Sequence, residues 1–90
     1  MNEAMDERRK RARFRAWRRG FREIDLILGG FADARIAALD AAALADFEAL
    51  LEAPDQDVYA WITNAAPTPA AFDTPIMTHL KAFRVAAQPS

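Results

Sequence analysis

The sequence predicts an all-α fold, a compact bundle of five helices in one small domain. The composition is rich in alanine and other good helix formers. Apolar residues recur at spacings of three and four, and glycine or proline separates these stretches. Ninety residues rarely supply two hydrophobic cores, so we expect a single domain over residues 1–90, frayed at about 1–7 and 87–90.

The first helix is expected over about residues 3–19, and Gly20 is expected to end or bend it. At 100° per residue, Phe14, Trp17 and Phe21 fall within an arc of about 60°, which predicts the buried side. A neighbouring arc of about 100° is basic and holds Arg8, Arg11, Arg15, Arg18, Arg19 and Arg22.

A second helix follows, with an apolar face of Ile24, Ile27, Leu28 and Phe31. The pair Gly29-Gly30 is expected to loosen or end it, because glycine is a poor helix former.

Asp40 is the expected N-cap of a third helix, whose apolar stripe is Leu44, Phe47, Leu50 and Leu51. Pro54 closes this helix, and Asp55 caps a short fourth helix. In the fourth helix Val58, Trp61 and Ile62 share a face.

Residues 64–71 contain Pro67 and Pro69 and are expected to form a surface loop. The fifth helix starts at Thr74-Pro75, an N-cap followed by proline at the first helical position. Its expected inward residues are Ile76, Leu80 and Phe83, and the tail from Gln88 is expected to fray.

The charge is divided unevenly along the chain. Residues 1–23 hold nine basic and four acidic groups, or +5, while residues 24–90 hold three basic and nine acidic groups, or −6. The basic helix could pair with the acidic remainder of the same domain, bind nucleic acid with Phe14 or Trp17 stacking on bases, or lie on an anionic membrane. The acidic remainder would repel a polyanion.

Few residue types suited to catalysis are present. There is no cysteine, the only histidine is His79, and the only serine is terminal, so no nucleophile has an evident base. Capping of the fourth helix explains Asp55 and Asp57 without a metal site. We therefore expect no enzyme, no metal and no stably bound cofactor. Since no apolar run would span a bilayer and no secretory signal is seen, we expect a complete, cytoplasmic chain without stable membrane insertion.

The segment from Arg19 to Glu23 is the most specific candidate for a site. Charges of opposite sign flank Gly20, which has no Cβ and admits a partner's backbone closely. Arginine can hold a carboxylate through two parallel hydrogen bonds. This pattern indicates a surface that docks another protein, although a helix-breaking turn with solvated charges would have the same spacing.

The run Arg18-Arg19-Gly20-Phe21-Arg22-Glu23-Ile24-Asp25 resembles the RGxxE signature of the factors that promote covalent FAD attachment to succinate dehydrogenase. A second stretch, Leu50-Leu51-Glu52 followed by Asp55, Asp57, Tyr59 and Trp61, is similar to that family's acidic turn leading to tryptophan. The likeness covers about Arg13 to Asn64. The sequence Asp55-Gln56-Asp57 departs from the family's commoner proline-containing turn.

The resemblance implies a five-helix bundle that binds the flavoprotein subunit of succinate dehydrogenase, with a related fumarate reductase as a second candidate client. It implies that a histidine of that subunit becomes bonded to the flavin while the factor only aligns the two. The partner-binding residues it implies are Arg19, Gly20, Arg22, Glu23, Asp25, Asp57 and Trp61. Two alternatives stay open: a small nucleic-acid-binding or regulatory protein, and an antitoxin-like interaction protein.

Overall fold

Five α-helices and two short 3₁₀ helices follow one another in residues 3–87, the part of the chain that the computed structural model describes. The elements in chain order are α1 (Glu3–Ala16), α2 (Arg22–Arg35), η1 (Ile36–Ala38), α3 (Ala41–Leu51), α4 (Asp55–Ile62), η2 (Ala70–Phe72) and α5 (Pro75–Ala87). The all-α prediction is confirmed. Residues 3–7, which we expected to fray, are helical, and the expected fraying from Gln88 lies outside the described residues.

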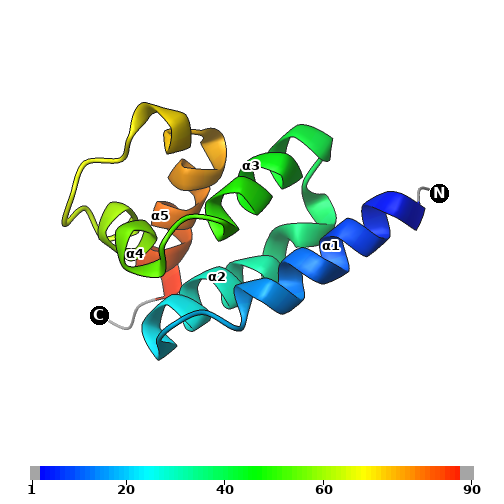
Figure 1. Cartoon of the computed structure of the whole chain (residues 1–90), viewed down its shortest axis with the longest axis horizontal. Coiled ribbons are helices and arrows are strands. Elements are labelled where there is room, and N and C mark those ends of the chain that lie inside the picture. The colour runs from blue at the N-terminus through cyan, green and yellow to red at the C-terminus, as the bar shows by residue number, and fades with distance from the viewer. Residues whose placement is uncertain (1–2, 88–90) are drawn as a thin grey trace.

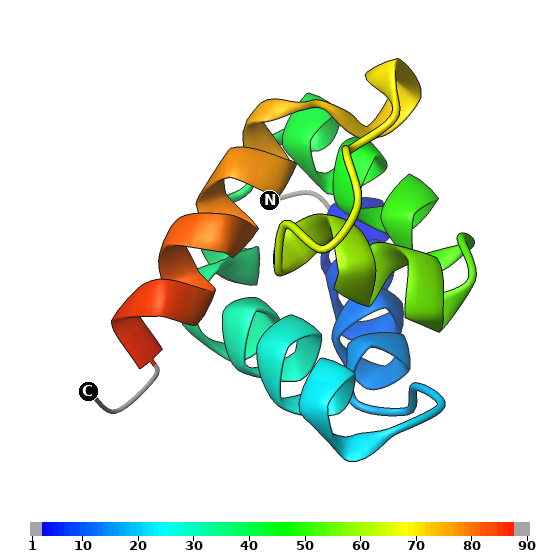
Figure 2. The ribbon, with the colours of Figure 1, turned by 90° about the vertical axis from the view of Figure 1, so that its left-hand side faces the viewer.

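The helices α1 and α2 form an antiparallel pair along the long axis of the molecule (Figure 1). The other helices cover this pair, and α5 packs against α2, α3 and α4. Figure 2 shows α1 and α5 on opposite sides of the bundle. At the centre Phe31 of α2 contacts Phe47 of α3 and Phe83 of α5, with ring centroids 5.7 and 5.8 Å apart. The core is therefore shared by helices from both halves of the chain.

The prediction for the buried side of the first segment was wrong for Phe14, whereas Trp17 and Phe21 are partly buried. The buried residues of α1 are Ala12 and Ala16, whereas Phe14 is 58% exposed. Position 14 is about 200° around the helix from position 12, so the two residues face opposite directions. Small alanine side chains let α1 pack closely on α2 and α3, and the large aromatic ring is left on the outside.

The prediction that Gly29-Gly30 ends the second helix was also wrong, because α2 continues to Arg35. A Cβ on Gly29 would lie 2.2 Å from Cδ2 of the Trp17 ring. Gly29 therefore leaves the space in which the Trp17 ring packs against α2, and it does not interrupt the helix. Ile24, Leu28 and Phe31 are buried as expected, and Ile27 is partly buried.

Replacing Gly29 with alanine should lower the free energy of unfolding by about 1–3 kcal/mol, because Trp17 must move off the helix. Gly30→Ala is the matched control: its Cβ would lie 3.4 Å from Phe83, an ordinary contact, and alanine favours helix by up to about 1 kcal/mol. Urea denaturation would measure both, with Trp61→Phe in the background so that emission reports Trp17 alone. Equal stability of the two variants would contradict this account of Gly29.

The later helix boundaries are close to those predicted. Asp40 caps α3 by accepting a hydrogen bond from the Ala43 N–H at 2.8 Å. The fifth helix begins at Pro75, and its buried residues are Ile76, Leu80 and also Met77, which the sequence did not single out. The N-cap of α4 is Pro54, so the prediction that Asp55 caps this helix was wrong.

Candidate functional site

The loop between α1 and α2 contains the segment that the sequence singled out. The helix α1 ends at Ala16, three residues before the predicted end. The backbone N–H of Arg19 donates instead to the Asp25 carboxylate of α2, at 2.7 Å. A side chain of the following helix therefore holds the loop, and Gly20 lies within the loop instead of ending α1. Figure 1 shows the loop at the end of the molecule where α4 lies.

The side chain of Arg19 points into the molecule and is only 9% exposed. Its Nε donates to Asp55 Oδ1 at 2.7 Å, and a terminal nitrogen lies 2.7 Å from the same oxygen. The terminal nitrogen also donates to the Leu51 carbonyl at 2.8 Å. A guanidinium with these partners inside the protein ties the loop to α3 and α4, so the Arg19 side chain is not part of the exposed surface.

Gly20 is exposed, and its backbone contacts the Asp55 carboxylate. Its N–H donates to Asp55 Oδ2 at 2.6 Å, so the two carboxylate oxygens hold two consecutive residues of the loop. A Cβ on Gly20 would lie 3.0 Å from Oδ2, tighter than an ordinary contact. The backbone of Gly20 has no positive φ, so the close carboxylate is the reason that favours glycine here.

Sequence reasoning missed Asp55 as the partner of the loop. Charged groups that are mostly buried need a partner, so a buried arginine would have called for a carboxylate. No local pattern indicates that Arg19 is buried, and Asp55 lies 36 positions away. Asp55 directly follows Pro54, so capping of the fourth helix was the simpler explanation for this residue.

An open hollow of about 390 Å³ lies beside the loop and is lined by Gly20, Phe21, Gln56 and Tyr59. The rings of Phe21 and Tyr59 meet edge to face, with centroids 5.2 Å apart. This contact joins the loop to α4 a second time. Trp61 does not line the hollow: it is half-buried and stacks on Phe72 of η2, with centroids 5.0 Å apart.

Besides Arg18 in the loop itself, three charged side chains next to the loop are exposed, namely those of Arg22, Glu23 and Asp57. None of the three has an ion-pair or hydrogen-bond partner for its side chain among the described residues. Leu26, 51% exposed, follows Arg22 and Glu23 by one turn of α2 and so shares their face. We call this region the docking surface; its residues are Gly20, Phe21, Arg22, Glu23, Leu26, Gln56, Asp57 and Tyr59.

Most of the other basic groups of α1 have acidic partners within the chain. Arg8 pairs with Glu48 at 2.6 Å, Arg13 pairs with Asp33 at 2.6 Å, and Arg15 pairs with Glu52. Much of the positive charge of α1 is therefore balanced by acidic residues of the same domain. This is the first of the three interpretations given for the uneven charge.

The pairing lowers the pKa of two of these acidic residues, Glu48 and Asp33. The hydrogen bond from Arg8 holds the pKa of Glu48 below its ordinary value. Hydrogen bonds from Arg13 and then Trp17 lower the pKa of Asp33 in the same way. Both carboxylates are thus kept ionised beside α1.

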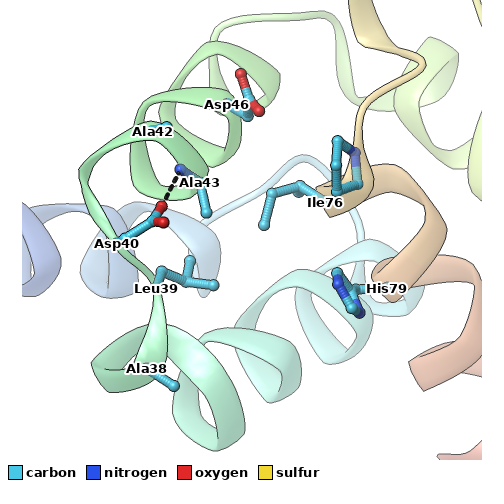
Figure 3. A pocket seen from close by; sticks show the side chains of 9 residues that line it. Ala38, Leu39, Asp40, Ala42, Ala43, Asp46, Ile76 and His79 are labelled. Atoms are coloured by element: carbon cyan, nitrogen blue, oxygen red, sulfur yellow. Dashed lines mark hydrogen bonds between the residues drawn. The ribbon is translucent and has the colours of Figure 1, made fainter.

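A second hollow, of about 380 Å³, lies at the start of α3 and α5 (Figure 3). It is lined mainly by small and apolar residues, with Asp46 on α3 and His79 on α5 as its titratable side chains besides the capping Asp40. Within the described residues, no group of three or more metal-ligand side chains is gathered. In residues 3–87, none of the helices has both the length and the apolar character to cross a membrane.

Comparison with known proteins shows which family the chain resembles. A family model described as flavinator of succinate dehydrogenase matches residues 10–84. The chain is similar to the FAD assembly factor SdhE of Acetobacter pasteurianus, 37% identical over 73 residues, which cover 81% of this chain and 67% of that protein.

Mitochondrial proteins are similar to the chain as well. Succinate dehydrogenase assembly factor 2 of Dictyostelium discoideum is 36% identical over 73 residues, 81% of this chain and 52% of that protein. Assembly factor 2-A of Drosophila erecta is 35% identical over 82 residues, 89% of this chain and 51% of that protein. The chain thus spans about two thirds of the bacterial relative and about half of these mitochondrial ones.

Proposed function

The chain belongs to the family of flavinators of succinate dehydrogenase, and we propose that it is an assembly factor that binds the flavoprotein subunit of that enzyme and promotes covalent attachment of FAD to it. The observation that carries this proposal is the match over residues 10–84, which includes the whole docking surface. The names of the relatives support the same activity, since they call those proteins FAD or succinate dehydrogenase assembly factors.

We propose that the docking surface contacts the flavoprotein directly. Its charged members Arg22, Glu23 and Asp57 have no internal partner among the described side chains, so they are free to pair with a partner's polar groups. Gly20 is exposed and lines the hollow beside the loop, so another backbone can approach it there. Arg22 could hold a carboxylate of the partner through two hydrogen bonds.

Arg19 and Asp25 act differently in this proposal. Both bind the loop from within the protein, Arg19 through Asp55 and Asp25 through the Arg19 N–H. They fix the shape of the docking surface before the partner arrives, which lowers the entropy lost on binding. Trp61 supports α4 by stacking on Phe72 and is not a contact residue.

The chain itself need not supply a catalytic group. Holding two reacting groups in the correct geometry can lower a barrier by roughly 7–11 kcal/mol in favourable cases. We therefore propose a non-catalytic factor, without a stably bound cofactor, that aligns flavin and protein within its client. We place it in the cytoplasm. The names of the three relatives compared above include succinate dehydrogenase or FAD and none includes fumarate reductase, so we propose one client.

Nucleic-acid binding is not proposed. Arg15 of the basic helix is paired with Glu52, and no relative above is named for such an activity.

Coexpression with the flavoprotein subunit, in cells that lack their own factor, tests the proposed function. We expect Glu23→Ala to reduce covalent flavin on the subunit by at least about fivefold, because a free charge of the docking surface is lost. Flavin fluorescence of the subunit in a denaturing gel measures this. Glu7→Ala, on an exposed part of α1 away from the loop, is the control and should give the level of the unchanged chain. The proposal fails if the subunit is equally fluorescent with and without the chain.

A further inference from the structure

An exposed aromatic side chain on α1 is not used by the docking surface. Phe14 is 58% exposed, and the other exposed large apolar side chain among the described residues, Leu26, belongs to the docking surface. A single exposed phenylalanine is ordinary on a protein surface. The surroundings of Phe14 are what distinguish it.

Cationic groups surround the Phe14 ring. The guanidinium of Arg18 lies 3.7 Å from the ring centroid, and Lys10 and Arg11 precede Phe14 by four and three positions, which makes them its neighbours on the helix. Neither Arg11 nor Arg18 has an acidic partner among the described side chains. Lys10 has only Glu7 at 3.9 Å, and both groups are mostly exposed. Positive charge is therefore left uncompensated around an apolar ring.

A hollow lies beside Phe14, and Trp17, which lines it, is held in place by contacts within the protein. An open hollow of about 260 Å³ is lined by Lys10, Arg13, Phe14 and Trp17. The Trp17 ring packs on Gly29, and its Nε1 donates to Asp33 at 3.2 Å. Arg13 donates to the same carboxylate oxygen of Asp33 at 2.6 Å. These contacts fix Trp17 in one orientation without any partner.

We propose that this hollow is a second part of the partner interface and receives an acidic segment of the flavoprotein subunit, with one apolar side chain of that segment against Phe14 and Trp17. We call the hollow together with the cationic groups beside Phe14 the aromatic–basic patch; its residues are Lys10, Arg11, Arg13, Phe14, Trp17 and Arg18. The proposal rests on the proposed function. Trp17 begins the loop that carries Gly20, so the patch and the docking surface adjoin each other in the chain.

Charge complementarity selects an acidic peptide as the occupant. The uncompensated cations attract carboxylates, and the fixed indole and phenyl faces attract an apolar side chain. A membrane fits less well because the Arg18 guanidinium stacks on one face of the Phe14 ring, so a charge would accompany the ring into the apolar layer. A nucleic acid fits less well because Arg8, Arg13, Arg15 and Arg19 are already held by carboxylates.

Calorimetric titration of the purified flavoprotein subunit with variants of the full chain tests the inference. Phe14→Ser and Arg18→Glu should each raise the Kd at least about tenfold, as for anchor residues of an interface. Arg35→Glu, a charge reversal at the far end of α2 and outside the patch, should change the Kd by less than about twofold. Circular dichroism checks that each variant is folded. A benzophenone amino acid at position 14 should crosslink to a peptide of the subunit rich in Asp and Glu.

The outcomes separate this inference from the proposed function. Unchanged affinity of both Phe14→Ser and Arg18→Glu overturns the inference and leaves the proposed function standing. No binding by the unchanged chain overturns both. If Phe14→Ser loses binding to phosphatidylglycerol vesicles or to a single-stranded oligonucleotide but keeps full affinity for the subunit, the patch serves another ligand and the inference is wrong.

Discussion

Replacing Asp55 with alanine should lower the free energy of unfolding by about 2–4 kcal/mol and weaken binding of the flavoprotein subunit. The variant leaves Arg19, only 9% exposed, without its carboxylate, and it also removes the acceptor of the Gly20 N–H. A charge left inside a protein without its partner is costly. Because both contacts hold the loop, its release should affect binding as well as stability.

The matched control for this variant is Asp57→Ala, two positions along the first turn of α4. Its exposed side chain has no partner among the described residues, so stability should change by less than about 0.5 kcal/mol. Urea denaturation followed by circular dichroism measures both variants. Similar losses of stability in the two would mean that Asp55 acts only through its place at the start of α4, and the role assigned to its contacts would be wrong.

Replacing Gly20 with arginine should leave the bundle folded and reduce affinity for the flavoprotein at least about hundredfold, an effect within the range of interface hot spots. The backbone of Gly20 has no positive φ, so a larger residue can adopt it. The new Cβ requires a shift of the Asp55 carboxylate of a few tenths of an ångström. The long side chain would then occupy the space beside the hollow of Phe21, Gln56 and Tyr59, where the partner is proposed to sit.

Ala37→Arg provides the control for an added arginine. Ala37 is exposed in η1, beyond the far end of α2 and about 20 Å of helix away from the loop. It should bind the subunit like the unchanged chain. Normal binding by a folded Gly20→Arg variant would remove Gly20 from the interface, whereas unfolding of that variant would show that the Asp55 contact cannot adjust.

The helices could be predicted from the sequence because their signals are local. Asp40 at an N-cap and Pro75 at the first position of α5 act within a single turn. Apolar spacing also identified the buried Ile24, Leu28 and Phe31 of α2. The orientation of α1 was missed because its core face consists of the small Ala12 and Ala16. Aromatic size is a poor guide where two helices pack closely.

The site could be located from the sequence but its contacts could not be derived. The segment from Arg19 to Glu23 was recognised by charge, glycine and family resemblance, all of which are local in the chain. The ion pair from Arg19 to Asp55 joins residues 36 positions apart, and the Trp17–Gly29 contact depends on how α1 lies on α2. Such contacts follow from the packing of the helices, which no local pattern records.

Affinity capture of the tagged chain from its own host tests the central claim most directly. Peptide mass spectrometry identifies the captured protein, and in-gel fluorescence shows whether it carries covalent flavin. We expect the unchanged chain to capture the flavoprotein subunit of succinate dehydrogenase, and Gly20→Arg to capture at least about tenfold less of it. Failure of the unchanged chain to capture this subunit, or equal capture by Gly20→Arg, would contradict the account.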